Sequence, residues 1–266
     1  MHNQIPEWNA LVSDADWHAA WEQLESTNNF PELTGRLCPA PCEDACTLRL
    51  SGAPVTMRAI ELAIIERAFR AGSVRPQRAA AGDAAIGRKV AVVGSGPAGL
   101  ACAQQLARAG HKVGVYEAAE RIGGLLRYGI PDFRLEKWVL DRRLAQMRAE
   151  GVRFHTGMRV GIDPEAAALR GAHDALVFAC GSSVPRDVVA PGRDLGGIRF
   201  ALDYLTYQNR RRIGAADAPI IDARGLDVVV IGGGDTGSDC VGTAIRQGLR
   251  RTTAMCSCTG RSRCRS

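Results

Sequence analysis

The sequence of 266 residues predicts an α/β chain in which a helical first part precedes two parallel-sheet segments. Three observations support this prediction. Two glycine-rich turns begin at Gly94 and Gly232, and each stands between a short apolar run and a helical pattern. Residues 1–80 instead show helical patterns around three closely spaced cysteines.

The bulk composition excludes several classes of protein. Hydrophobic residues make up 46% of the chain, enough for a core, and no run of about 18 apolar residues predicts a membrane span. The N-terminus lacks the charged and apolar regions of a signal peptide, so we expect a cytoplasmic protein with no membrane partner. The net charge of +6 equals the six arginines found from residue 246 onward, where no acidic residue occurs. The rest of the chain is balanced, so we expect no nucleic-acid partner.

The first 80 residues are expected to form helices joined by short loops. Ser13 or Asp14 is predicted to cap a helix whose apolar stripe, 17–24, carries two tryptophans that we interpret as core residues. Residues 28–35 are expected to form a loop. A further helix is predicted over 57–71, with Thr56 as its cap.

Three cysteines follow the predicted loop with the spacing C-x3-C-x3-C, namely Cys38, Cys42 and Cys46, and prolines stand between the first two. Thiolates are soft ligands and prolines stiffen a loop, so this pattern favours a metal or iron–sulfur site. The alternative is a set of buried thiols, because three cysteines do not complete a four-ligand site. The cysteines outside this cluster and the tail are expected to be inert core thiols: Cys102, Cys180 and Cys240.

The first glycine-rich turn lies between a strand over 90–93 and a helix over 97–108, followed by a second strand over 112–116. Its glycines have the spacing G-x-G-x-x-G: Gly94 allows the tight turn, Gly96 lets a pyrophosphate approach the backbone, and Gly99 lets the helix pack closely. Glu117 ends the second strand 18 positions later, where a carboxylate accepts hydrogen bonds from a ribose. The pattern predicts dinucleotide binding rather than a purely structural turn. The acidic residue favours FAD or NAD over NADP.

The middle of the chain continues this nucleotide-binding pattern. Gly123 and Gly124 again allow close approach to the backbone, and a helix is expected over 135–150. The buried side of that helix is predicted from its apolar residues, Trp138, Val139, Leu144 and Met147. A strand over 175–182 ends near Gly181, as in flavoproteins that bind two dinucleotides, although an ordinary buried strand explains it as well.

The second glycine-rich turn stands 138 residues after the first, with Gly232, Gly234 and Gly237 in the same spacing. A strand over 227–231 precedes it, and a helix to Gln247 follows. Two such turns imply two dinucleotides, as when a pyridine nucleotide reduces a flavin. Neither turn has a C-x2-C or C-x4-C pair nearby, which argues against a disulfide reductase.

These segments together resemble the small (beta) subunits of NADPH-dependent glutamate synthases. The resemblance covers most of the chain and depends on four long stretches: N-N-F-P-E-L-T-G-R-L-C-P-A-P-C-E, V-G-S-G-P-A-G-L-A-C-A, R-I-G-G-L-L-R-Y-G-I-P-D-F-R-L-E-K and G-G-G-D-T-G-S-D-C. It implies a helical Fe–S domain over 1–80, a Rossmann-like FAD domain over 87–200, and the start of an inserted NADPH-binding domain over 201–266. The last domain is expected to be incomplete, with an atypical tail over 249–266.

The resemblance also implies the residues of each site. FAD is expected on Gly94, Ser95, Gly96, Ala98, Gly99 and Glu117, and further along the flavin on Gly124, Leu125 and Arg134. NADPH is expected on Gly232, Gly233, Gly234, Asp235, Thr236 and Gly237. The ligands of [4Fe–4S] clusters are expected to be Cys38, Cys42, Cys46 and Glu61. No side chain is expected to act as a catalytic acid or base.

The activity implied by the resemblance is electron transfer. Small subunits of this family pass electrons from NADPH through FAD and Fe–S clusters to a large (alpha) subunit, where glutamine-derived ammonia and 2-oxoglutarate become glutamate. Members of the family begin earlier, with a further cysteine group, and continue beyond the second turn, so the chain is expected to be truncated at both ends. Two alternatives remain open: an inactive fragment, or a related subunit of the dihydropyrimidine dehydrogenase or ferredoxin–NADP reductase type that serves another partner.

Overall fold

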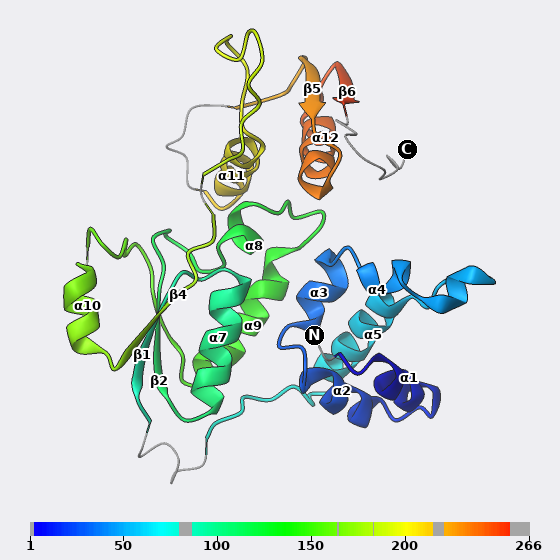
Figure 1. Cartoon of the computed structure of the whole chain (residues 1–266), viewed down its shortest axis with the longest axis vertical. Coiled ribbons are helices and arrows are strands. Elements are labelled where there is room, and N and C mark those ends of the chain that lie inside the picture. Colours follow the sequence, from blue (N-terminus) through cyan, green and yellow to red (C-terminus); the bar gives the residue numbers. More distant parts are fainter. Residues whose placement is uncertain (1–2, 80–86, 164, 183, 215–220, 256–266) are drawn as a thin grey trace. The chain divides into compact units, whose positions relative to one another are not determined.

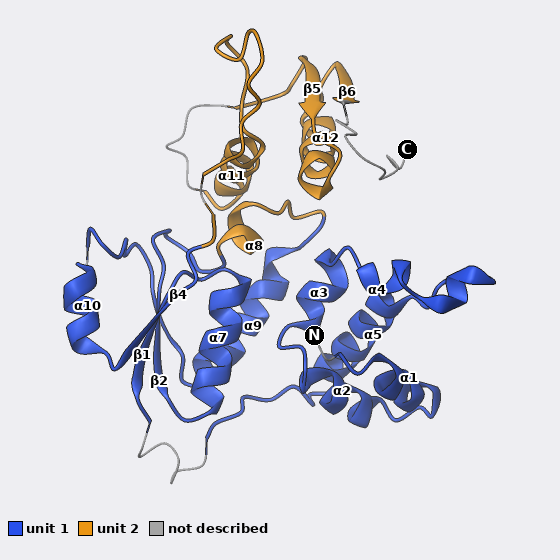
Figure 2. Cartoon of the chain, in the orientation of Figure 1, with its two compact units in different colours: residues 1–123, 134–180 blue, residues 124–133, 181–266 orange. Residues whose placement is uncertain are grey.

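The computed structural model describes residues 3–79, 87–163, 165–182, 184–214 and 221–255 (Figure 1). Contacts divide the chain into two units, which are coloured separately in Figure 2. Unit 1 comprises residues 1–123 and 134–180, and unit 2 comprises residues 124–133 and 181–266. Within the described residues, none of the helices combines the length and the apolar character that a membrane crossing needs.

The helical part of unit 1 contains helices α1 to α5 and one short 3₁₀ helix. Their bounds are α1 Ile5–Ser13, α2 Trp17–Glu25, α3 Pro31–Leu37, α4 Pro41–Asp44, η1 Thr47–Leu50 and α5 Met57–Arg70. One apolar core joins α1, α2 and α5, and its buried members are Trp8, Ala20, Trp21, Leu24, Ile64, Ile65 and Ala68. The tryptophan stripe is therefore core, as predicted.

Two local predictions in this part are wrong. The cap of α2 is Asp16, whose side chain accepts a hydrogen bond from the Ala19 amide at 3.0 Å, because Ser13 still belongs to α1. The expected loop over 28–35 contains most of α3, which starts at Pro31. Proline at the first position and Glu32 in the first turn are both favourable at a helix N-terminus.

The remainder of unit 1 is built on a parallel sheet of strand order β3-β2-β1-β4. The strands are β1 Lys89–Val93, β2 Lys112–Tyr116, β3 Arg153–His155 and β4 Ala175–Phe178, and the helices are α7 Pro97–Arg108, α9 Lys137–Ala149 and α10 Ala166–Ala172. Helix α7 packs against β1 and β2. Helix α10 lies on the opposite face of the sheet (Figure 1), where Leu169 packs against Ala91 and Val93. Helices on both faces bury the sheet, as expected for parallel strands.

Three predictions for this part need correction. Strand β4 ends at Phe178, so it is shorter than expected. Trp138 is 49% exposed, because it lies outside the buried face of α9, which also contains Arg143 and Gln146. Cys180 is exposed, whereas Cys240 is buried and Cys102 is partly buried, so the prediction of core thiols is wrong for Cys180.

Unit 2 contains α8 Leu125–Tyr128, α11 Ala201–Arg212, β5 Asp227–Ile231, α12 Asp235–Gln247 and β6 Arg251–Met255. Strands β5 and β6 pair in parallel, with Val229 opposite Thr253. Helix α11 is joined to α12 by the Tyr204 hydroxyl, which donates to Gln247 Oε1 at 2.7 Å. The segment expected to be an atypical tail from residue 249 thus begins with a strand, and its last part, 256–266, lies outside the described residues.

Candidate dinucleotide and iron–sulfur sites

The first glycine-rich turn leaves β1 at Gly94 and enters α7 at Gly96. Gly94 has a φ of +103°, and a Cβ there would lie 2.3 Å from the carbonyl oxygen of Ala179. A Cβ on Gly99 would lie 2.1 Å from the carbonyl oxygen of Gly94. At Gly96, by contrast, a Cβ would have no neighbour within 4 Å. Two of the glycines are therefore required by packing, and the third leaves open space at the helix N-terminus, where a phosphate binds.

Glu117 lies beside this turn at the end of β2. Its Oε2 accepts hydrogen bonds from both the amide, at 3.0 Å, and the hydroxyl of Ser95, and its Oε1 accepts from the Ala119 amide at 2.9 Å. The Ser95 hydroxyl in turn accepts from the Gly123 amide at 2.9 Å. These bonds hold the carboxylate against Ser95, inside the turn, and use three of its about four acceptor sites, which leaves about one for a ribose hydroxyl. The geometry fits the predicted recognition of a ribose.

The second turn, in unit 2, repeats the same geometry. Gly232 has a φ of +135°, and a Cβ on Gly237 would lie 2.5 Å from the Gly232 carbonyl oxygen. Gly234 is the N-cap of α12, and a Cβ there would have no neighbour within 4 Å. The predicted residues Gly233, Asp235 and Thr236 are exposed around this helix N-terminus. The second turn therefore also leaves room for a phosphate against the first amides of a helix.

The remaining residues predicted to lie along the flavin are divided between the units. Gly124 has a φ of +50° and is the N-cap of α8, and Leu125, 52% exposed, is the first residue of that helix in unit 2. Arg134 lies where the chain returns to unit 1, and Ala98 is exposed in the first turn of α7. Of the predicted flavin residues, the structure thus brings together Gly94 to Gly99 and Glu117.

The segment 38–46, called the cysteine loop here, follows α3 directly and includes the short helix α4, which contains Cys42. Cys38 is the C-cap of α3, and its Sγ accepts a hydrogen bond from the Ala40 amide at 3.4 Å. Burial raises the pKa of the Cys42 thiol, and the neighbouring Glu61 and Cys38 raise it further. Backbone hydrogen bonds from Val55 and Leu48 lower the pKa of the Cys46 thiol. Amide donors around sulfur favour the thiolate, which is the form that binds iron.

Glu61 lies on α5 and is buried, which raises its pKa, while Asn3 Nδ2 donates a hydrogen bond to its Oε1 at 2.9 Å. The structure therefore brings Cys38, Cys42 and Glu61 into one neighbourhood. Across the described ranges, however, no three His, Cys, Asp or Glu side chains are arranged to hold a metal ion. The loop fits an Fe–S cluster in its donor type and its amide surroundings, but it is not a preformed four-ligand site.

The comparisons with known proteins agree with this geometry. The model of the family described as pyridine nucleotide-disulphide oxidoreductase matches residues 88–257, which is more than half of the chain. The chain belongs to this family. A second model, described as dihydropyrimidine dehydrogenase domain II, 4Fe-4S cluster, matches residues 1–73. The two matches confirm the predicted fold class, a helical Fe–S part followed by a Rossmann-like part.

Curated relatives narrow the family further. The glutamate synthase [NADPH] small chain of Mycobacterium tuberculosis (strain ATCC 25618 / H37Rv) is 54% identical over 251 residues, which are 92% of this chain and 51% of that protein. The small chain of Bacillus subtilis (strain 168) is 48% identical over 93% of this chain and 50% of its own length. The chain therefore spans about half the length of the curated relatives it matches. These relatives confirm the predicted resemblance.

Among solved structures, Mycobacterium tuberculosis FprA in complex with NADPH superposes with a TM-score of 0.53 at 23% identity, covering 63% of this chain and 43% of that one. This match supports the fold alone. The two family models agree with the predicted cofactor classes, a flavin with a pyridine nucleotide over residues 88–257 and a [4Fe–4S] cluster over residues 1–73, and the two relatives are named as NADPH enzymes.

The sequence patterns did not predict the buried charged residues Glu32, Arg143 and Glu150. One signal was available for Arg143. It stands four residues from both Val139 and Met147, on the buried face of α9, so it interrupts an apolar stripe.

Proposed function

We propose that the chain is an electron-transfer portion of a glutamate synthase small subunit, which takes electrons from NADPH at the second turn and passes them through FAD at the first turn to an Fe–S cluster. One observation supports this most strongly. Both turns have the same geometry, with a positive-φ first glycine, an open second glycine and a packed third glycine. Two phosphate-binding turns in one chain suit a donor and an acceptor dinucleotide.

The residues of the chain have positioning roles in this proposal. The open space at Gly96 and the amides of α7 hold the pyrophosphate of FAD, and Glu117 binds the ribose. Gly234 and the amides of α12 hold the pyrophosphate of NADPH. Bound flavin accepts a hydride and releases electrons singly, so no side-chain acid or base is needed. The thiolates of the cysteine loop would hold the iron.

We also propose the large (alpha) subunit of glutamate synthase as the partner, and the cytoplasm as the place where the two meet. The small-chain relatives support this partner, because their name marks them as one component of a larger enzyme. In that assembly the large subunit would use the electrons to make glutamate from 2-oxoglutarate and glutamine-derived ammonia.

The test is anaerobic reduction of the flavin-loaded chain by NADPH, followed through loss of the flavin absorbance. The proposal predicts reduction in the wild type, loss of reduction without loss of flavin in Gly234→Val, and loss of flavin in Gly96→Val. Flavin-loaded wild-type chain that NADPH does not reduce would refute the proposed donor site. Co-purification with the large subunit tests the partner, and separate elution of the two chains would refute it.

A further inference from the structure

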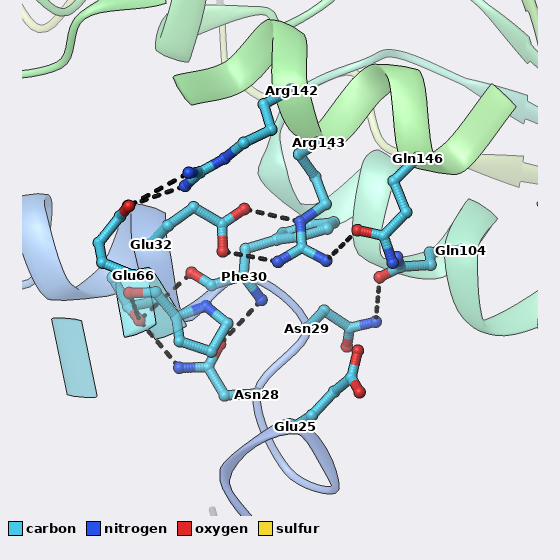
Figure 3. A network of polar contacts seen from close by, with 12 residues as sticks. Glu25, Asn28, Asn29, Phe30, Glu32, Glu66, Gln104, Arg142, Arg143 and Gln146 are labelled. Atoms are coloured by element: carbon cyan, nitrogen blue, oxygen red, sulfur yellow. Dashed lines mark hydrogen bonds and ion pairs between the residues drawn. The ribbon is translucent and has the colours of Figure 1, made fainter. Parts of the chain in front are cut away.

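A buried ion pair connects the helical part of unit 1 to the Rossmann-like part (Figure 3). Arg143 on α9 is 1% exposed and Glu32 on α3 is fully buried. The guanidinium donates from Nε to Glu32 Oε1 at 2.6 Å and from Nη2 to Oε2 at 2.7 Å. Its third nitrogen donates to Gln146 Oε1 at 2.8 Å. A bidentate pair has a narrower geometry than a single hydrogen bond, so it restrains how the two helices move against each other.

The pair belongs to a larger network that reaches α7. Glu150, whose side chain is fully buried, accepts hydrogen bonds from Arg108 Nη2 at 2.9 Å, Gln104 Nε2 at 3.0 Å and Gln146 Nε2 at 3.0 Å. On the helical side, Arg108 also pairs with Glu25 at 3.1 Å. Gln104 Oε1 accepts from Asn29 Nδ2 at 2.9 Å. Two glutamates and an asparagine of the helical part are thus joined to both α7 and α9.

The network connects the two sites by a short path. Cys38 is the C-cap of α3, six residues beyond Glu32, which is roughly 9 Å along a helix. Gly96 is the N-cap of α7, eight residues before Gln104, which is roughly 12 Å along that helix. Helical segments and buried hydrogen bonds therefore link the cysteine loop to the first dinucleotide turn. A displacement of α3 against α9 would move the loop relative to the turn.

Stability alone does not explain a charged pair at this place. Apolar residues of similar volume commonly stabilise a buried position as well as an ion pair does, because both charges must lose their hydration. What apolar contacts do not supply is the directional geometry of the bidentate pair. A second pair joins α9 to α5: Arg142 donates from Nη1 to Glu66 Oε2 at 3.1 Å and from Nη2 to Oε1 at 2.8 Å, but both side chains are partly exposed. The Glu32–Arg143 pair differs from it in being shielded from water and in holding α3, the helix that ends at Cys38.

We propose that Glu32 and Arg143 are positioning residues that hold the cysteine loop at a fixed distance and orientation from the flavin turn, and that they thereby set the rate of electron transfer between flavin and cluster. The effect on the rate of electron transfer rests on the function proposed above. The positioning of the cysteine loop by Glu32 and Arg143 does not, because it involves only residues of this chain.

The first experiment measures backbone hydrogen exchange in the full chain with Glu32→Gln. The control is Arg148→Met, which removes an exposed arginine of the same helix that contacts Phe154 and not the helical part. Removing one partner leaves a buried charge unpaired, so exchange over residues 31–46 should quicken by at least about tenfold in Glu32→Gln. The control should match the wild type. Unchanged exchange in Glu32→Gln would overturn the proposal, whether or not the chain transfers electrons.

The second experiment separates positioning from stability with the apolar double variant Glu32→Leu/Arg143→Met. We expect this variant to regain protection against exchange, and to keep wild-type flavin content and wild-type flavin reduction by NADPH. After anaerobic reconstitution with iron and sulfide, cluster reduction by the flavin should nevertheless remain at least about tenfold slower, because the directional contacts are absent. Wild-type cluster reduction in the double variant would show that the pair only stabilises. If the wild type reduces no cluster, the proposed function fails, and the exchange measurement still decides the positional claim.

Discussion

Gly96→Val separates binding of FAD from folding of the chain. Gly96 has φ −65° and ψ 177°, an extended conformation that any residue adopts, and a Cβ there has no neighbour within 4 Å. The unliganded fold should therefore lose only about 1 kcal/mol or less, the cost of a poorer N-cap residue. The valine side chain would instead fill the space proposed for the pyrophosphate.

The expected loss of flavin affinity follows from the phosphate contacts at the helix N-terminus. Hydrogen bonds to a charged group contribute about 1.5–3 kcal/mol each, so losing two costs about 3–6 kcal/mol. That corresponds to about two to four orders of magnitude in the dissociation constant. The variant should thus emerge from gel filtration without flavin even when it is prepared with excess FAD.

The assay pairs flavin content with urea denaturation followed by tryptophan fluorescence. Gly99→Ala is the variant for comparison, because it should disturb folding directly. Its Cβ would lie 2.1 Å from the Gly94 carbonyl oxygen and so would force α7 from its place. We expect Gly99→Ala to lose about 1–3 kcal/mol of stability, the usual effect of overpacking. Gly96→Val with a wild-type flavin content would refute the placement of FAD at this turn.

Three further predictions concern the other sites. Gly234→Val should keep the flavin but prevent its reduction by NADPH, measured anaerobically by absorbance, and normal reduction would contradict the second site. Cys42→Ser should lower the iron content after reconstitution, and unchanged iron would favour buried thiols. Burial alone would raise the pKa of Glu66, but the hydrogen bond and charge of Arg142, with those of Arg36, lower it. The ion pairs of ionised Glu66 therefore stabilise the fold above the ordinary carboxyl pKa of about 4.3. This stabilisation is lost as the pH falls through the lower pKa that Glu66 has in the folded chain. Glu66→Gln should therefore have a lower free energy of unfolding than the wild type near neutral pH, and the two values should converge in acid. Urea denaturation at several pH values would measure this. A difference in free energy of unfolding that does not change with pH would contradict the ion pair.

The sequence predicted the two turns well because their geometry depends on local contacts. The positive φ of Gly94 and Gly232, the helices that follow and the placement of Glu117 beside Ser95 all follow from a strand, a tight turn and a helix. Few other residue types fit the first and third glycine positions. The G-x-G-x-x-G spacing therefore predicts most of the geometry of these turns.

The rest of unit 1 was harder to predict because it depends on contacts between distant segments. Arg143 and Glu32 are 111 residues apart in sequence, and neither has a local reason to be buried. Trp138 was expected in the core from its apolar character, but it lies outside the buried face of α9, where Arg143 and Gln146 are buried instead. The arrangement of the cysteines likewise depends on α5, where Arg58 Nη1 donates to the Cys38 carbonyl oxygen at 2.9 Å.

Binding of a flavin at the first turn and of iron at the cysteine loop by one and the same chain can be tested directly. The most direct measurement is an absorbance spectrum of the purified chain, with flavin and iron assayed on the same sample after anaerobic reconstitution. We expect flavin absorbance bands together with bound iron, no flavin in Gly96→Val, and a lower iron content in Cys42→Ser. A folded chain that binds neither flavin nor iron would contradict this expectation.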